Sequence, residues 1–404
     1  MKEDCFAEKE RCLAADADPQ LLGWAVLAFR TFWKTDEKEA FALPYALNDK
    51  IRELTPYEPI SGAFQIRLDA NESYLSLPEP VLAEIRARLE KLDFNRYPDP
   101  IGGELCRAFA GYYGIDPKFV TAGNGSDELI SILANAFLMK GDAMLTVAPD
   151  FSMYQFYASI SEIDCVVLDK GPELSIDVDE LIRKAVETGA KMILFSNPCN
   201  PTSLGLSRKQ VRKLIRSVDS LVVLDEAYMD FWDQSLLSEV EDYENLIILR
   251  TSSKAIGCAA IRLGFAVANE RLSNALRAVK SPYNVNSFTQ MAGTVLFQHK
   301  ELLERARRQI ICQRESLYDA LLSVQKEFPG KYKLWKPETN FVFIKPEAPE
   351  DARRIFEFLL KNQIAIRCMG NYLRITAGSP EENAELIKLW RLWFAEEEKN
   401  HENG

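Results

Sequence analysis

Lys254 stands where a lysine can do chemistry. It follows an apolar, β-branched run, Leu246 to Leu249, that is typical of a buried strand. Open α/β sheets bind their ligands at the carboxyl ends of their strands, and desolvation there lowers the pKa of an amine and makes it nucleophilic. The pattern therefore indicates a lysine that can form a Schiff base with a carbonyl group. Taken alone, it fits an ordinary solvated loop lysine equally well.

Residues on either side of Lys254 suit an anion. The hydroxyls of Thr251 and Ser253 precede it, and Arg262 follows eight positions later, just before another apolar run, Leu263 to Ala268. A guanidinium offers a two-pronged contact to a phosphate, and hydroxyls add further donors. The segment therefore favours phosphate binding.

A second anion cradle is predicted near residue 125. The motif GNGSDELI follows a short apolar run, Phe119 to Ala122, and its glycines Gly123 and Gly125 permit close approach of the backbone to a ligand. We expect Ser126 to be the N-cap of a helix over 127–138. The first N–H groups of a helix suit a phosphate, but many such turns only cap helices.

Apolar runs of strand length alternate with helical patterns between residues 143 and 251. The strand candidates are AMLTVAP, CVVLD, KMILFSNP, LVVLDEAY and LIILRTS, and helices are expected over 178–188 and 207–218. This alternation predicts a mostly parallel sheet with helices on its faces. Polar side chains follow three of the strands, which directs them to one edge of the sheet: Asn197, Asn200, Asp225, Tyr228 and Lys254.

The chemistry of these residues is complementary. A buried Asp225 can keep a pyridine nitrogen protonated, Asn200 and Tyr228 can bond a phenolic oxygen, and Phe151 can stack on a ring. Pyridoxal phosphate combines such a ring with an aldehyde for Lys254 and with a phosphate. Each residue also has a structural explanation: Asp225 as a turn cap, Phe151 as core, Asn200 as part of a turn. Their joint placement favours the cofactor.

Composition excludes several other classes. The chain has 404 residues, which predicts more than one domain, and its net charge of −11 argues against a nucleic-acid partner. No apolar run approaches the roughly 20 residues of a membrane span. Eight cysteines without C-x-x-C spacing indicate reduced thiols and a cytoplasmic location, and two histidines make a metal site a poor expectation.

The ordered motifs LDANES, RYPDP, GNGSDEL, PDFSMY, NPCNPTS, DEAY, RTSSKAIGCAAIRLGF, TNFVF and YLRITAG resemble those of fold type I pyridoxal-phosphate enzymes. These enzymes form the aspartate aminotransferase superfamily, and the resemblance is closest to its histidinol-phosphate aminotransferase branch. It covers residues 44 to the C-terminus. Two departures stand out: Ser203 replaces the usual glycine after NPT, and Cys258, Ala259 and Ala260 replace the usual Leu-Ala-Gly.

The resemblance implies an α/β fold with a large domain, built on a mostly parallel seven-stranded sheet flanked by helices, and a smaller α+β domain. The expected division is an appended N-terminal helical segment, 1–45; a first part of the small domain, 46–95; the large cofactor domain, 96–290; and a linking helix with the small C-terminal domain, 291–404. One long helix over 286–324 is the expected link.

The resemblance also implies roles for individual residues. Lys254, Asp225 and Tyr228 would be catalytic. Pyridoxal 5'-phosphate would be held by these three together with Gly125, Ser126, Asp127, Phe151, Asn200, Thr251, Ser253, Arg262 and, from the neighbouring subunit, Tyr97. Substrate would be bound by Tyr57, Asn71, Arg367 and Arg374. A homodimer with shared active sites follows, with a small-molecule amine and a 2-oxo acid as substrates.

The implied activity is transamination between a primary amine and 2-oxoglutarate through a Schiff base on Lys254. L-Histidinol phosphate is the first candidate for the amine, and aromatic amino acids are the second. Two alternatives stay open: a decarboxylase resembling threonine-phosphate decarboxylase, which needs no 2-oxo acid, and a non-catalytic regulator that binds the cofactor. The retained Lys254 argues against the regulator.

Overall fold

The computed structural model describes residues 45–56 and 58–402. Apart from Tyr45, the predicted helical segment 1–45 lies outside them, and so does Tyr57. Residues up to Thr55 belong to a unit of their own, whose described part contains one short helix, α3 (Asp49–Arg52), with an ion pair of 2.7 Å between Arg52 and Asp49. All other described residues belong to the second unit, which begins at Pro56.

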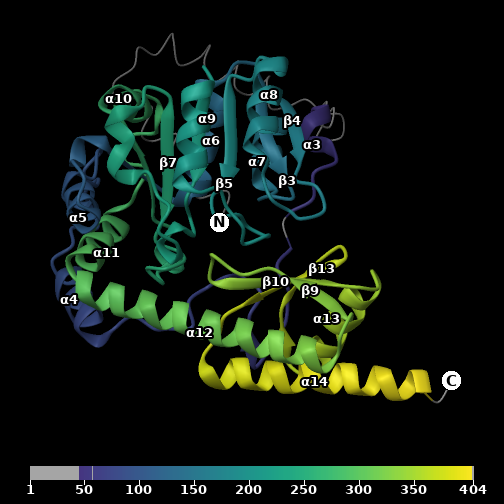
Figure 1. The fold of residues 1–404 in the computed structure, drawn as a ribbon. Coiled ribbons are helices and arrows are strands. Elements are labelled where there is room, and N and C mark those ends of the chain that lie inside the picture. The colour runs from purple at the N-terminus through teal and green to yellow at the C-terminus, as the bar shows by residue number, and fades with distance from the viewer. Residues whose placement is uncertain (1–44, 57, 403–404) are drawn as a thin grey trace, which may run out of the picture. The chain divides into compact units, whose positions relative to one another are not determined.

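A seven-stranded sheet organises the second unit, in the order β2-β8-β7-β6-β5-β3-β4 (Figure 1). The strands are β2 (Val120–Gly123), β3 (Ala143–Ala148), β4 (Asp164–Asp169), β5 (Met192–Ser196), β6 (Leu221–Asp225), β7 (Leu246–Thr251) and β8 (Gly264–Ala268). Only β8 runs antiparallel to its neighbours in this sheet, and the other pairs are parallel. The predicted mostly parallel sheet is confirmed.

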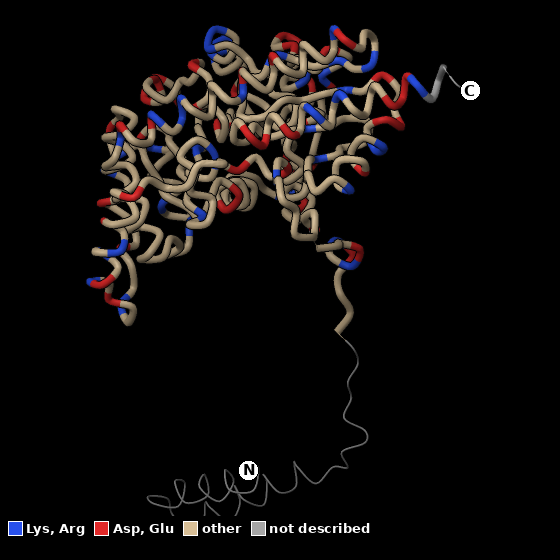
Figure 2. The backbone as a smooth tube through the Cα atoms, turned by 90° about the horizontal axis from the view of Figure 1, so that it is seen from below, with Lys and Arg blue, Asp and Glu red and all other residues tan. Residues whose placement is uncertain are grey.

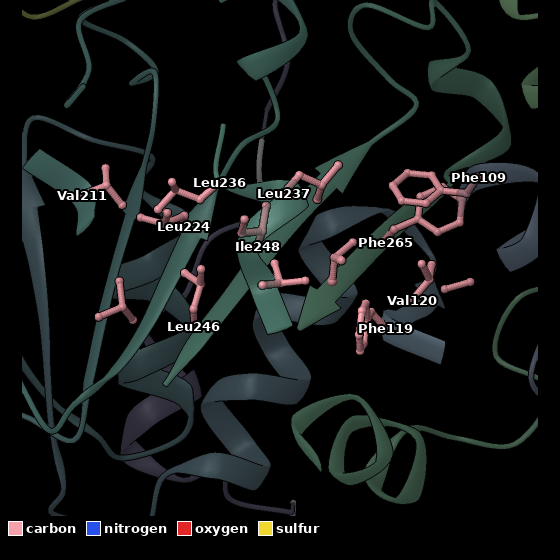
Figure 3. Packing of buried hydrophobic residues seen from close by; sticks show 14 of the residues in the cluster. Phe109, Phe119, Val120, Val211, Leu224, Leu236, Leu237, Leu246, Ile248 and Phe265 are labelled. Atoms are coloured by element: carbon pink, nitrogen blue, oxygen red, sulfur yellow. The ribbon is translucent and has the colours of Figure 1, made fainter. Parts of the chain in front are cut away.

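Helices cover both faces of this sheet because its central strands are apolar on both sides. Successive residues of β7 belong to opposite cores, for example Ile248 to the first core and Ile247 to the second. The first core takes residues of α5 (Gly103–Tyr113), α8 (Val178–Thr188) and α9 (Arg208–Ser217); the second takes residues of α6 (Gly125–Phe137), α7 (Met153–Ile160) and α10 (Glu270–Val279). Figure 3 shows part of the first core, where Phe109 stacks on Phe265 with ring centres 3.9 Å apart.

A smaller antiparallel sheet has the order β12-β13-β10-β9. Its strands are β9 (Tyr332–Leu334), β10 (Phe341–Pro346), β12 (Arg367–Met369) and β13 (Tyr372–Thr376). Residues of α12 (Lys300–Glu327), α13 (Asp351–Lys361) and α14 (Pro380–Glu402) share its apolar core. Separately, β1 (Ile66–Arg67) pairs in parallel with β11 (Ile364–Ala365), so a segment early in the chain joins the C-terminal part.

The remaining elements are short or connect the two sheets. They are α4 (Glu79–Leu89), α11 (Ser287–Gln298) and the 3₁₀ turns η1 (Pro117–Phe119), η2 (Met229–Phe231), η3 (Leu237–Asp242) and η4 (Ala259–Ile261). In Figure 1, α12 runs from α11 towards the small sheet and lies beside α14.

Two local predictions were wrong. The long helix expected over 286–324 is two helices, α11 and α12, because the backbone leaves the helical region at His299 (φ −95°, ψ 49°). The N-cap of α6 is Asn124 and not Ser126, and α6 starts at Gly125. There the carboxylate of Glu128 accepts the N–H of Asn124 at 2.7 Å, so Ser126 lies inside the first turn.

Basic and acidic residues alternate in short stretches along the described backbone, without a long run of one sign (Figure 2). Some form pairs one turn apart on a helix, such as Arg353 with Glu357 at 2.6 Å on α13. Among residues 45–56 and 58–402, no helix is long and apolar enough to cross a membrane. The six cysteines in these ranges are all free thiols.

Candidate active site

The carboxyl ends of β5, β6 and β7 lie at the same edge of the large sheet, since these strands are parallel neighbours. Asn200 follows β5, Asp225 ends β6, and Lys254 follows β7. The topology therefore brings together three polar residues that are far apart in the sequence. Ligands of open parallel sheets bind at this edge.

The surroundings of the Lys254 amine suit a nucleophile or a base. Its Nζ donates to the carbonyl oxygen of Ala70 at 3.1 Å and lies 5.8 Å from the ring centre of Tyr228. Burial, with help from the nearby positive charges of Arg374 and Arg262, lowers the pKa of the Lys254 amine to about 8. At pH 7 about a tenth of the amine is then uncharged, and proton transfer and attack on a carbonyl both need the uncharged form.

Asp225 is buried and held from two sides. The hydroxyl of Tyr154 donates to Oδ2 at 2.8 Å, and the N–H of Ala227 donates to Oδ1 at 3.1 Å. Burial raises the pKa of the Asp225 carboxyl to about 7, although both hydrogen bonds lower it. A carboxylate that is costly to leave unpaired, as here, is stabilised by a positively charged partner such as a protonated ring nitrogen.

Sequence reasoning missed Tyr154. A usable signal was its spacing, because Phe151 and Tyr154 are three residues apart where α7 begins, and residues at that spacing in a helix share a face. In the structure the Phe151 ring is half-buried and edge-on to the Tyr154 ring, with centres 5.6 Å apart. The predicted stacking residue and the partner of Asp225 therefore touch each other.

Tyr228 and Asn71 form the next part of the site. The hydroxyl of Tyr228 accepts from Nδ2 of Asn71 at 2.8 Å, and burial raises the pKa of that hydroxyl to about 12. Asn71 has a φ of 54°, and its backbone N–H donates to Oγ1 of Thr376 on β13 at 3.0 Å. Nδ2 of Asn340 donates to the carbonyl oxygen of Asn71 at 3.1 Å. Thr376 and Asn340, which the sequence did not single out, thus fix Asn71.

Arg374 joins the small sheet to the large one. It extends from β13, and its two terminal nitrogens donate to Oδ1 of Asn200 at 2.5 Å and to the carbonyl oxygen of Asp69 at 2.7 Å. Its guanidinium also lies over the Phe341 ring, 5.4 Å from the centre. The residue predicted to bind substrate therefore contacts one that is predicted to bind the cofactor.

Arg367 is on the same face of the small sheet as Arg374. The two residues are directly opposite each other in the antiparallel pair β12 and β13, and such pairs project to one side. Arg367 also lines a cavity of about 320 Å³ with Ile60, Arg353, Phe356, Cys368 and Gly370. Tyr57, the other predicted substrate residue, lies outside the described residues.

Hydrogen-bond donors gather where a phosphate is expected. Oγ1 of Thr251 donates to Oγ of Ser253 at 3.0 Å, and Arg262 donates to the same Ser253 oxygen at 3.3 Å. The other terminal nitrogen of Arg262 pairs with the carboxylate of Asp127 in the first turn of α6 at 3.1 Å. Two hydroxyls, a guanidinium and a helix start thus form one cluster.

Two glycines allow the backbone to close around this cluster. A Cβ on Gly264 would lie 2.4 Å from the carbonyl carbon of Gly125 and 2.6 Å from the nitrogen of Ser126, so β8 packs directly against the start of α6. Gly125 itself has a φ of 77°. The N-terminal N–H groups of α6, together with Arg262 and the hydroxyls of Thr251 and Ser253, fit the phosphate of the predicted cofactor.

Tyr97 is directed to solvent in the single chain. Its side chain is 82% exposed and stacks on Tyr283 with ring centres 4.7 Å apart. Phe94, Ile101 and Phe288, which come from the same two stretches of the chain, are also exposed apolar residues.

Among the described residues, no three His, Cys, Asp or Glu side chains are grouped so as to hold a metal ion.

Comparison with known proteins shows a family and a fold. The family described as aminotransferase class I and II matches residues 64–389. A histidinol-phosphate aminotransferase of Clostridium novyi is 40% identical over 342 residues, covering 83% of this chain and 94% of that protein.

Two solved structures are similar in fold. The histidinol-phosphate aminotransferase of Sinorhizobium meliloti, in complex with pyridoxal-5'-phosphate, has a TM-score of 0.78 at 20% identity and covers 88% of this chain and 100% of that one. The L-threonine-O-3-phosphate decarboxylase of Porphyromonas gingivalis has a TM-score of 0.69 at 20% identity and covers 81% of this chain and 99% of that one.

Proposed function

Because this chain belongs to the aminotransferase class I and II family and is a pyridoxal-phosphate-dependent aminotransferase, we propose that its amino donor is L-histidinol phosphate and that its acceptor is 2-oxoglutarate. The observation that carries the choice of donor is the pair Arg367 and Arg374, directly opposite each other on one face of the small sheet. Two guanidiniums suit a phosphate in one half-reaction and the carboxylates of a 2-oxo acid in the other.

We propose that the predicted cofactor residues act as their positions suggest. Thr251, Ser253 and Arg262, with the start of α6, would hold the phosphate, and Asp225 would pair with the ring nitrogen. Tyr228 and Asn200 would face the ring oxygen. When bound, pyridoxal phosphate supplies a ring that stabilises negative charge on the carbon next to the transferred amine.

The chain's own residues then account for proton movement. With a pKa lowered to about 8, the Lys254 amine can take a proton from the substrate Cα, and it would return that proton to the former aldehyde carbon of the bound cofactor. Asn71 holds the Tyr228 hydroxyl at 2.8 Å, which orients it beside the lysine. Arg374 fixes the anionic group of the substrate, so that the Cα–H bond is presented to Lys254.

A homodimer with shared sites is part of the same proposal. Tyr97 is exposed and stacks on Tyr283, and Phe94, Ile101 and Phe288, from the same two stretches of chain, are exposed as well. These apolar side chains suit contact with a second copy. In such a dimer Tyr97 would reach the partner's phosphate site. A cytoplasmic location, supported by the free thiols in the described part of the chain, also belongs to the proposal.

The predicted domain division remains a prediction as well. The core of the small sheet takes Leu68 together with residues from Leu317 onward, which supports a small domain made of two separate stretches of the chain. Val81, Val295 and Leu303 belong to a core of the large sheet, so the bounds 46–95 and 291–404 stay a prediction. The cores on the two faces of the large sheet support a cofactor domain over 96–290.

A donor panel tests the substrate proposal. Histidinol phosphate, phenylalanine, tyrosine and threonine phosphate are each supplied with 2-oxoglutarate, and glutamate formation is followed. The highest kcat/KM is expected for histidinol phosphate. Carbon dioxide release from threonine phosphate without any 2-oxo acid would instead establish the decarboxylase alternative, and a preference for unphosphorylated donors would overturn the proposed donor.

A further inference from the structure

Ser203 has a backbone conformation that a serine adopts only at a cost. Its φ is 64°, in the left-handed region that favours glycine, and its side chain is completely buried. A non-glycine residue held in that region points to a compensating interaction or to a functional role. The side chain of Ser203 provides such an interaction.

The hydroxyl of Ser203 uses its whole hydrogen-bonding capacity. Its Oγ accepts the backbone N–H groups of Glu338 at 3.0 Å and Thr339 at 3.1 Å, and it lies 2.6 Å from Oγ1 of Thr339. Since both lone pairs of Oγ are engaged, its proton is free for Thr339, whose own hydroxyl donates to the carbonyl oxygen of Phe341 at 3.2 Å. One side chain thus bonds three groups of a segment that is 135 or 136 residues away.

On one side of this contact is the loop that carries Asn200. The N–H of Ser203 donates to the carbonyl oxygen of Cys199 at 2.8 Å, and Asn197 exchanges two hydrogen bonds with Leu206 across the same loop. Gly205 packs so closely that a Cβ there would lie 2.5 Å from Oδ1 of Asn197. The loop is therefore held by internal hydrogen bonds, and we expect a shift of Ser203 to displace Asn200 as well.

On the other side is the strand that orders the substrate end. Thr339 and Asn340 lead into β10, which pairs with β13 so that Phe343 is opposite Arg374. Arg374 returns to the first loop, where it donates to Oδ1 of Asn200. The contacts form a closed ring: Ser203 to Thr339, along β10 to β13, and through Arg374 back to Asn200.

We propose that Ser203 is a positioning residue: it clasps the start of β10 to the Asn200 loop and thereby fixes Arg374 beside Asn200. A glycine at this position would have no backbone strain and would keep only the backbone hydrogen bond from the N–H of Glu338 to the carbonyl oxygen of residue 203, which is 3.2 Å long. The start of β10 would then be held less firmly, and the small sheet could shift relative to the large one. The serine gives up some backbone stability and in return holds the two sheets in the arrangement that binds substrate.

Two variants and a control test the proposal. Ser203→Ala removes the hydroxyl but leaves a side chain at an unfavourable φ. Ser203→Gly removes the hydroxyl and also the energetic cost of that φ, so the glycine variant remains informative if the alanine variant fails to fold. Ser207→Gly is the control: it lies in the same connection, its hydroxyl caps α9 and bonds only within that turn, and a serine-to-glycine change at an N-cap has a small effect.

The first measurement is amide hydrogen exchange in the folded holoenzyme, read on peptides covering 338–341. Loss of the Ser203 bonds should speed exchange there by about tenfold, since a lost buried hydrogen bond changes an equilibrium by roughly that factor. Ser207→Gly should leave these peptides unchanged. If exchange in Ser203→Gly equals that of the parent protein, the clasp does not exist.

The second measurement is steady-state kinetics with the best donor of the panel and 2-oxoglutarate, and it rests on the proposed contact of Arg374 with substrate. Ser203→Gly should raise KM about tenfold and change kcat by less than about threefold. In an Arg374→Ala background the same change should have almost no further effect on KM, since the two residues act through one contact. If Ser203→Gly speeds exchange but leaves KM unchanged, or if its effect on KM adds to that of Arg374→Ala, Ser203 does not act through Arg374. Neither result would bear on whether the clasp exists or on which donor the enzyme uses.

Discussion

The proposed phosphate-binding end of the site, called the phosphate end, takes Thr251, Ser253 and Arg262 from one short stretch of chain, and the Arg262 side chain is 52% exposed. At the proposed substrate-binding end, called the substrate end, Arg374 is buried, and its two contacts, Asn200 and the carbonyl oxygen of Asp69, are 174 and 305 positions away. Solvent screens the first guanidinium much more than the second. Each hydrogen bond at the substrate end should therefore matter more.

The two ends also depend on different parts of the fold. The phosphate end needs only β7, β8 and the start of α6, all neighbours in or on the large sheet. The substrate end exists only when the small sheet is docked on the large one, because Arg374 is on β13 and Asn200 follows β5. Changes that loosen docking should impair substrate binding before they impair cofactor binding.

The largest effect is expected at Lys254, which lies between the two ends. Lys254→Ala should lower kcat by about 10²- to 10⁴-fold, the usual contribution of a general acid or base. The wild-type holoenzyme should be yellow and lose its visible absorbance on borohydride reduction, with the cofactor then linked to Lys254 in a peptide map. The assignment would be contradicted if Lys254→Ala still formed a reducible link to the cofactor at another residue. It would also be contradicted if the wild type remained colourless with pyridoxal phosphate. The exposed Lys213→Ala serves as control.

A smaller effect is expected at Arg367. Loss of a charge-assisted contact costs about 1.5–3 kcal/mol, so Arg367→Ala should lower kcat/KM for histidinol phosphate by about ten- to a hundredfold. Aromatic amino acids, which have no phosphate, should lose far less. Arg353→Ala, at the same cavity, is the matched control and should have little effect on either donor. Equal losses for both classes of donor would mean that Arg367 does not read phosphate.

Tyr154 belongs to neither end, and its removal should affect the cofactor ring. Tyr154→Phe deletes the hydrogen bond to Asp225, so the affinity of the cofactor-free protein for pyridoxal phosphate should fall about tenfold. An analogue with carbon in place of the ring nitrogen should bind both proteins alike. Equilibrium titration measures both affinities, and an equal loss for the analogue would show that Tyr154 acts on packing and not through Asp225.

The pH dependence of the cofactor-free protein checks the same contact. The native pKa of Asp225 is raised from 3.8 to about 7, so the folded state holds this proton more tightly than the unfolded state. The contribution of Asp225 to stability is therefore complete at low pH and declines as the pH rises through that interval. Tyr154→Phe should extend the decline to higher pH in thermal unfolding, and Asp225→Asn should abolish it.

The smallest effect is expected at Tyr97. If its hydroxyl reaches a partner's phosphate site, Tyr97→Phe should weaken cofactor retention about three- to tenfold, as for one hydrogen bond, without changing the melting temperature of the cofactor-free protein. Tyr318→Phe is the control, because Tyr318 is on α12 and packs against the core of the small sheet. Sedimentation at assay concentration should show a dimer for both variants. A fully active monomer would rule out shared sites.

Much of the large sheet could be predicted from the sequence because its strands are short apolar runs with clear ends. The break at His299 could not be predicted, since the apolar periodicity continues across it and only the backbone torsions reveal it. Ser126 was assigned as an N-cap from its residue type, but the Glu128 carboxylate accepts the N–H of Asn124, and α6 begins at Gly125.

The sequence by itself determined which groups can do chemistry and that Asn200, Asp225 and Lys254 share a sheet edge, because parallel strands place whatever follows them on the same side. Only the tertiary structure decided that Arg374 contacts Asn200, that Tyr154 holds Asp225 and that Ser203 bonds Thr339. These contacts join residues 71 to 174 positions apart. Neither strand nor helix periodicity extends over such separations, so the contacts exist only once α7 has packed on the large sheet and the two sheets have packed together.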